Sequence, residues 1–196
     1  MSYYFAIVGT QDNPQFEYEF GTSKQGGDGQ ARFAEQARHL NQFVVHSSLD
    51  VVEEVQWGNQ GQMYLKCVDK FFHNYVSCFV TGANTKFLLL HQPTLAANTR
   101  YAYGSAGSAG GAGGPMMAAG GNATLTAVSS SSSSRASTAI GANPTSAATE
   151  EAIKNFFNEV YENWIKTTMS PFYKANMEIR SPVFRSRVAA AGKKYL

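Results

Sequence analysis

Two histidines and an aspartate have the spacing in this sequence most suggestive of chemistry. His39 and His46 lie seven residues apart on a predicted helix, and Asp50 follows His46 by four residues. An aspartate at that distance can orient an imidazole for metal binding or proton transfer. A metal site needs a third ligand, and neither a cysteine nor another histidine is placed to supply one. We therefore favour an exposed helix face over a metal or catalytic site.

The remaining residue types that carry chemistry are equally sparse. Cys67 and Cys78 lie on successive predicted strands, and a turn centred on Phe72 and His73 would place them directly opposite each other. We expect a reduced, buried pair rather than a disulfide. The glycine-rich run 104–114 neither follows a strand nor opens a helix, so a linker is favoured over a phosphate-binding loop. Phosphate-binding, nucleophile-elbow and zinc-protease motifs are absent. The sequence thus predicts no catalytic residue, metal or cofactor.

Composition limits what kind of chain can position these residues. The sequence has 196 residues, 43% hydrophobic and 13% aromatic, which suits one ordinary domain with a packed core. No apolar run is long enough for a membrane-crossing helix, and no secretory signal is visible, so we expect a soluble intracellular protein. Residues 95–148 are mostly Ala, Gly, Ser and Thr, which predicts a disordered insertion. One domain is expected from residues 1–94 and 149–196.

Outside the insertion, residue patterns predict the element order ββ-α-βββ-α-α. Strands at 3–9 and 14–20 form a hairpin, with the second strand at an edge, and strands at 63–68, 75–81 and 86–91 form an antiparallel meander. The last two strands are apolar on both faces, so helices must cover both faces of the sheet. A helix capped by Thr149 ends near Pro171, and a final helix runs from Ser181 to Gly192.

The first predicted helix spans residues 29–57 and is amphipathic. Apolar or small residues recur in it at steps of three and four and should face the core: Phe33, Ala37, Leu40, Val44, Ser47, Val51 and Val55. The opposite face carries polar side chains that include His39, Gln42, His46, Asp50 and Glu53.

Charge is balanced outside the insertion but unevenly placed. Residues 163–196 hold seven basic side chains against the single acid Glu178. Such a segment can meet an acidic partner or an anionic membrane, although we favour an ordinary solvated face. Nucleic-acid binding fits poorly, because aromatics such as Phe5, Phe79 and Phe87 lie in apolar strands without interleaved basic residues.

Nine short stretches, in this order, carry a resemblance to a known family: Asp12–Glu17, His39–Phe43, Leu49–Asp50, Met63–Lys66 and Val68–Phe71 before the insertion, and Ile153–Phe157, Pro171–Tyr173, Ile179–Ser181 and Gly192–Lys194 after it. They resemble sedlin, the small longin-fold subunit of the TRAPP vesicle-tethering complexes. The similarity covers about residues 1–92 and 150–196 and skips the insertion.

The resemblance implies a longin-like α+β fold, a five-stranded antiparallel sheet with one helix on one face and two on the other. It also implies a non-enzymatic adaptor in transport between endoplasmic reticulum and Golgi, cytoplasmic and peripheral at those membranes. The partners would be other TRAPP subunits, both small core subunits and larger complex-specific ones, with membrane contact only through the complex. The complex promotes nucleotide exchange on Rab-type GTPases, and this subunit supplies no exchange residue.

Asp50 resembles the family's aspartate at a partner-facing position of the first helix. We predict partner binding by Asp50 with its helix neighbours His46, Leu49 and Glu53, and the alternative is an ordinary solvated acid. Phe43 flanks this group.

A function of another class stays open from the sequence alone. A longin-like domain could bind a lipid or another small apolar ligand in a groove near Phe156, Phe157 and Trp164. A hydrolytic enzyme has no motif in its favour.

Overall fold

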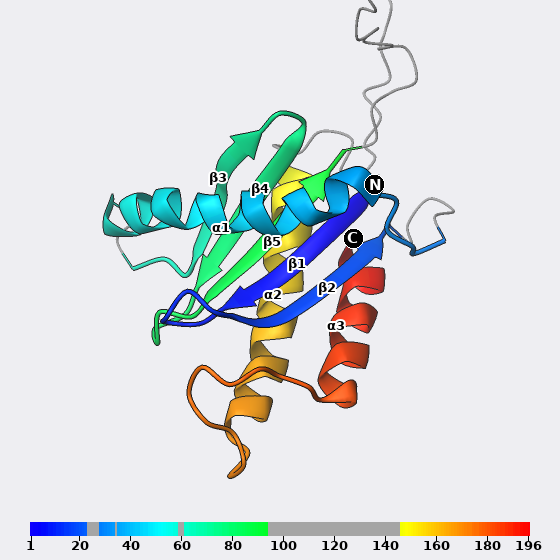
Figure 1. The fold of residues 1–196 in the computed structure, drawn as a ribbon. Coiled ribbons are helices and arrows are strands. Elements are labelled where there is room, and N and C mark those ends of the chain that lie inside the picture. The colour runs from blue at the N-terminus through cyan, green and yellow to red at the C-terminus, as the bar shows by residue number, and fades with distance from the viewer. Residues whose placement is uncertain (23–27, 34, 59–60, 94–145) are drawn as a thin grey trace, which may run out of the picture. The chain divides into compact units, whose positions relative to one another are not determined.

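A five-stranded antiparallel sheet lies between one helix and a pair of helices (Figure 1). The computed structural model describes residues 1–22, 28–33, 35–58, 61–93 and 146–196. The strands are β1 (Ser2–Val8), β2 (Pro14–Gly21), β3 (Tyr64–Phe71), β4 (Asn74–Val80) and β5 (Lys86–Gln92). They run in the order β2-β1-β5-β4-β3, with every neighbouring pair antiparallel. The predicted meander, edge hairpin and α+β class are confirmed.

The helices are α1 (Glu35–Gly58), α2 (Ala147–Thr168) and α3 (Pro182–Tyr195). Helix α1 covers one face of the sheet, and α2 and α3 pack side by side on the other (Figure 1). The chain therefore has the predicted order ββ-α-βββ-α-α. The predicted insertion at 95–148 falls almost wholly outside the described residues, so its disorder stays a prediction.

Two core layers form because side chains alternate across the central strands. On β1, Phe5 and Ile7 point to the α2 and α3 side, whereas Tyr4 and Ala6 point to the α1 side. The larger layer is rich in aromatic rings, among them Phe156 of α2, which meets Phe5 edge-on at 5.4 Å. Residues from both sides of the 94–145 gap thus share one core.

The buried face of α1 differs from the predicted one by about one residue. Leu40 is 44% exposed and Ser47 is also exposed, whereas Leu49 is only 4% exposed and packs in the core. The observed series includes the polar Ser48, which hydropathy alone assigns to the surface. Its hydroxyl donates to the Val44 carbonyl at 2.8 Å and pairs with Asp69 at 3.1 Å, so its burial leaves no unpaired group.

Three predicted helix ends are also corrected. Helix α1 begins at Glu35 rather than near residue 29, and α2 is capped by Ser146, whose side chain accepts from the Thr149 amide. Helix α3 continues through Gly192 to Tyr195. A Cβ on Gly192 would lie 2.9 Å from a ring carbon of Phe20, so this glycine permits close packing of α3 on β2 and does not end the helix.

The two cysteines do not face each other. The turn does lie between β3 and β4 as predicted, but irregularities on either side of Lys66 and Cys67 shift the register. Cys67 therefore pairs with Ser77, and Cys78 pairs with Lys66. Both cysteines are free thiols. Burial raises the pKa of both, most strongly for Cys78, which keeps them protonated and unreactive.

His91 is buried on β5 between the rings of Tyr3 and Tyr75, at centroid distances of 6.3 and 5.4 Å. Neither of its ring nitrogens has a hydrogen-bond partner among the residues that the structure describes. Burial lowers the pKa of His91 to about 4, because the charged imidazolium cannot be solvated there.

We expect His91 to make the fold acid-sensitive. Below about pH 6.5 the unfolded chain binds a proton that the folded chain refuses down to about pH 4, so the free energy of unfolding falls as pH falls through this window. The loss between pH 7.5 and pH 5 is about 2 kcal/mol. The variant His91→Leu should lack this part of the pH dependence in urea titrations, whereas His46→Gln, at an exposed position, should keep it. Parallel pH profiles for wild type and His91→Leu would contradict the assignment.

Candidate functional site

The predicted partner-binding residues divide into an exposed and a buried group. His46, Asp50 and Glu53 are exposed on α1, but the side chain of Leu49 belongs to the core beneath them. With about 3.6 residues per turn, Asp50 lies opposite the buried series that includes Val45 and Val52. Leu49 is therefore a core residue that supports the helix from beneath, and its expected place on the exposed surface of the helix is wrong.

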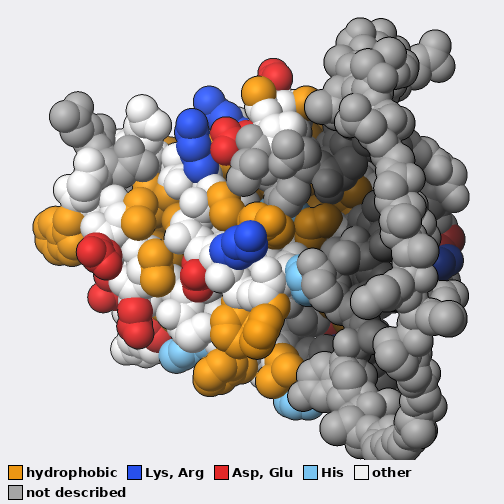
Figure 2. Space-filling view, turned by 90° about the horizontal axis from the view of Figure 1, so that it is seen from above, with side chains coloured by type: hydrophobic (Ala, Val, Ile, Leu, Met, Phe, Trp, Pro, Cys, Tyr) orange, Lys and Arg blue, Asp and Glu red, His pale blue; other side chains and the backbone are white. Residues whose placement is uncertain are grey.

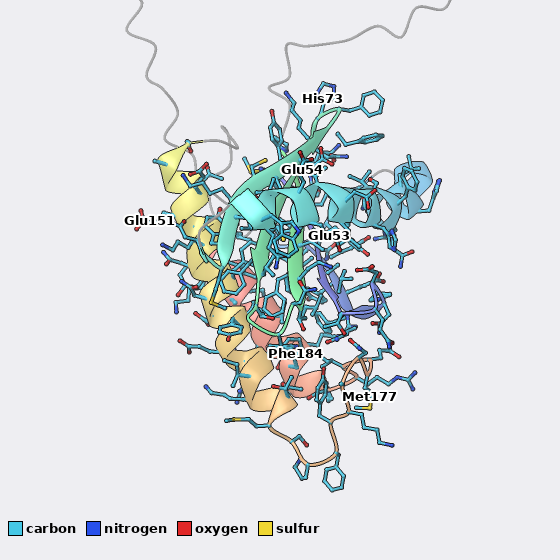
Figure 3. The ribbon with its side chains drawn as sticks, turned by 90° about the vertical axis from the view of Figure 1, so that its left-hand side faces the viewer. Glu53, Glu54, His73, Glu151, Met177 and Phe184 are labelled. Carbon is cyan, nitrogen blue, oxygen red and sulfur yellow. The ribbon has the colours of Figure 1, made fainter. Side chains whose placement is uncertain are left out.

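Two aromatic side chains flank Asp50 along the helix. Phe43 lies seven residues before it and Trp57 seven residues after it, and they are 62% and 91% exposed. Seven residues are about two helical turns, so all three share one side of α1 with His46 and Glu54. We call Phe43, His46, Asp50, Glu54 and Trp57 the α1 outer face. Figure 2 shows acidic and hydrophobic side chains next to each other on the surface, and Figure 3 labels Glu53 and Glu54 on this helix.

Asp50 and Glu53 differ in the interactions that their carboxylates make. Among the described residues, no hydrogen bond or ion pair engages the carboxylate of Asp50 or Glu54, so both are available to a partner. Glu53 instead pairs with the ammonium group of Lys86 at 3.5 Å, and Asp12 pairs with the same group at 3.2 Å. The Lys86 side chain is only 2% exposed, so these acids compensate a buried charge. Glu53 thus has a structural role, joining α1 to β5.

A groove of about 550 Å³ runs beside the α1 outer face, between α1 and the β1–β2 hairpin. Its lining includes the apolar side chains of Ala6, Val8 and Phe43. On its polar side, Glu17 accepts hydrogen bonds from Tyr4 at 2.8 Å and from Gln42 at 2.6 Å. Burial, followed by the bond to Glu17, raises the pKa of Tyr4, which therefore remains a donor.

The alternative ligand groove predicted near the second long helix is not formed by its named residues. Phe156 and Phe157 are fully buried and Trp164 is nearly so, and all three pack into the larger core layer. Their aromatic rings fill the space between helix and sheet instead of bordering an opening. Phe43 is predicted from the sequence only as a neighbour of the expected group, and Trp57 is not predicted, although each is an apolar side chain that interrupts the polar face of the predicted helix.

Within the described residues, no three His, Cys, Asp or Glu side chains gather as a metal-binding group. His39 and His46 are both exposed on α1, and both border the groove. None of the described helices is both long and apolar enough to span a membrane.

The fold and this surface define a small α+β domain that presents aromatic and acidic side chains from its single-helix face. The sedlin family model matches residues 7–194, and the chain belongs to the sedlin family. It is 33% identical over 196 residues to the transport protein particle 20 kDa subunit of Schizosaccharomyces pombe, covering 100% of both chains. It is 31% identical over 195 residues to the probable trafficking protein particle complex subunit 2 of Drosophila melanogaster, covering 100% of this chain and 97% of the relative.

A third relative supports the same family assignment. The probable trafficking protein particle complex subunit 2 of Caenorhabditis elegans is 32% identical over 194 residues, covering 99% of this chain and 96% of the relative. The expected sedlin family is therefore confirmed.

Proposed function

We propose that this chain is a non-catalytic adaptor subunit of a TRAPP-type tethering complex in transport between endoplasmic reticulum and Golgi. In this role it links the small-subunit core to a larger, complex-specific subunit. The complex as a whole acts as an exchange factor for Rab-type GTPases, and this chain contributes binding without exchange chemistry. It works in the cytoplasm, at the surface of those membranes.

The α1 outer face is the observation that carries this proposal. Two exposed aromatic rings flank a carboxylate that has no partner among the described residues, on a helix whose opposite side is anchored in the core. Exposed aromatic side chains of this kind are enriched among residues that dominate binding energy, and neighbouring charges set the specificity. Asp50 at the centre would meet a basic group of the partner, with Phe43 and Trp57 entering apolar recesses on either side.

The other predicted contacts take secondary places in this proposal. His46 borders Asp50 by one helical turn and contributes a polar contact at the groove side. Glu53 holds α1 in position through Lys86, and Leu49 fixes the helix from below.

Purification of the tagged full chain from its own cells tests the proposal. We expect subunits of a trafficking protein particle complex to accompany it in fixed ratios through size-exclusion chromatography. A chain that elutes alone under mild conditions, or one that turns over a substrate, would contradict the adaptor role.

A further inference from the structure

A second exposed apolar surface lies at the segment between α2 and α3, residues 169–181, which we call the α2–α3 loop. Met169 and Phe172 are 77% and 86% exposed, and Met177 is also exposed. Figure 3 shows Met177 on this loop, whereas Phe184 of α3 lies inward and is almost fully buried. Large apolar groups placed together in this way mark a contact with another apolar phase.

The loop is fixed in place, so these side chains are held in a defined position. The side-chain oxygen of Asn176 accepts from the Thr10 amide at 3.0 Å, and the backbone carbonyl of Asn176 accepts from the Asn13 side chain at 2.8 Å. The Ile179 amide donates to the Gln15 carbonyl at 2.8 Å. These bonds tie the inner side of the loop to the β1–β2 hairpin. The outer side, with Phe172, therefore remains exposed for lack of an internal partner and not because the loop is loosely packed.

The basic side chains near the loop indicate that it contacts an anionic surface. Lys166 and Lys174 flank the exposed apolar side chains, and no described residue forms an ion pair with either. The loop's acid, Glu178, is paired with Arg180 at 2.7 Å. Apolar side chains that can enter the acyl boundary, beside free cations that attract anionic headgroups, are the two features of a reversible membrane contact.

We propose that the α2–α3 loop binds an anionic membrane surface directly, with Phe172 and Met169 inserted and Lys166 and Lys174 at the headgroups. The α1 outer face lies across the sheet from the helices that carry this loop (Figure 1), so the loop and α1 can be occupied together. This contact goes beyond the adaptor role and departs from the sequence expectation of indirect membrane contact and a merely solvated basic segment.

Flotation of the purified full chain with lipid vesicles tests the proposal. The probes are phosphatidylcholine vesicles with about 30 mol% phosphatidylserine and vesicles of phosphatidylcholine alone; an anionic leaflet adds attraction that scales with the number of basic groups. We expect binding only to the anionic vesicles, weakening as salt rises. Phe172→Asp, and separately Lys166→Gln with Lys174→Gln, should each lower the vesicle affinity about tenfold.

The matched control is Phe72→Asp, which removes a similarly exposed ring at the β3–β4 turn and leaves the loop intact. It should bind vesicles like the wild type, and thermal unfolding should show all variants folded. Equal binding by Phe172→Asp and wild type, or no binding of wild type to anionic vesicles at low salt, would overturn the proposal. It would also be overturned if Phe172→Asp lost co-purifying protein while vesicle binding stayed unchanged, because the loop would then be a protein interface.

Discussion

Replacing Asp50 with alanine should weaken incorporation of the chain into its complex by about 2–5 kcal/mol, the usual effect of losing one partner of a desolvated charge pair. The carboxylate is exposed in the isolated chain and has no partner among the described residues, so the fold itself does not depend on it. We expect the free energy of unfolding to change by less than about 0.5 kcal/mol. A large loss of assembly at unchanged stability is the signature of an interface residue.

The experiment compares binding of the two chains to the remaining subunits of the complex, by titration, together with urea unfolding of each chain alone. Glu151→Ala is the control, because Glu151 is an exposed acid on α2, on the other side of the sheet (Figure 3). It should bind like the wild type. If Asp50→Ala binds within a factor of two of wild type, Asp50 is an ordinary solvated acid.

Replacing Phe156 with alanine should lower the free energy of unfolding by about 3–5 kcal/mol, as truncation of a fully buried phenylalanine usually does. Its ring is completely buried and lies 5.4 Å from Phe5 of β1 and 5.7 Å from Phe20 of β2, by ring centroids. It therefore joins the segment after residue 145 to the first hairpin. Such a loss is a large share of the roughly 5–15 kcal/mol that holds a typical domain together.

Urea unfolding followed by circular dichroism measures this change, with Phe172→Ala as the control at a position that is 86% exposed. The control should stay within about 0.5 kcal/mol of wild type. A loss below about 1 kcal/mol for Phe156→Ala would mean that α2 does not pack on the sheet as described.

Element order, edge strand and the need for helices on both faces could all be read from the sequence, because alternation and helical periodicity respond directly to burial. The strands that contain Phe5 and Leu89 are apolar on both faces, so both faces of the sheet must be covered. The register of α1 could not be read in the same way. Val44 belongs to two candidate apolar series. The choice between Leu40 and Leu49 depends on the burial of Ser48, whose hydroxyl bonds the Val44 carbonyl within α1 and the Asp69 carboxylate of β3.

The candidate site shows the same division between local and tertiary information. Exposure of Asp50 follows from helical spacing, and its importance was suggested by the resemblance to sedlin. The structural role of Glu53 could not be predicted from the sequence. It depends on the ion pair with Lys86, which lies 33 residues further along the chain and comes near Glu53 only in the folded state. An irregularity in β3 between Cys67 and Asp69 shifts the register so that Cys67 does not pair with Cys78, and nothing in the local sequence predicts this irregularity.

Whether the α1 outer face meets a larger subunit can be measured with a photo-crosslinking amino acid placed on that face in the intact complex. With Glu54→p-benzoylphenylalanine, irradiation should join this chain covalently to a larger subunit of the complex. The same group at Glu151, on α2, should give no such product. Abundant crosslinks from position 151 and none from position 54 would show that partners meet a different face, which would contradict the proposed role of the α1 outer face.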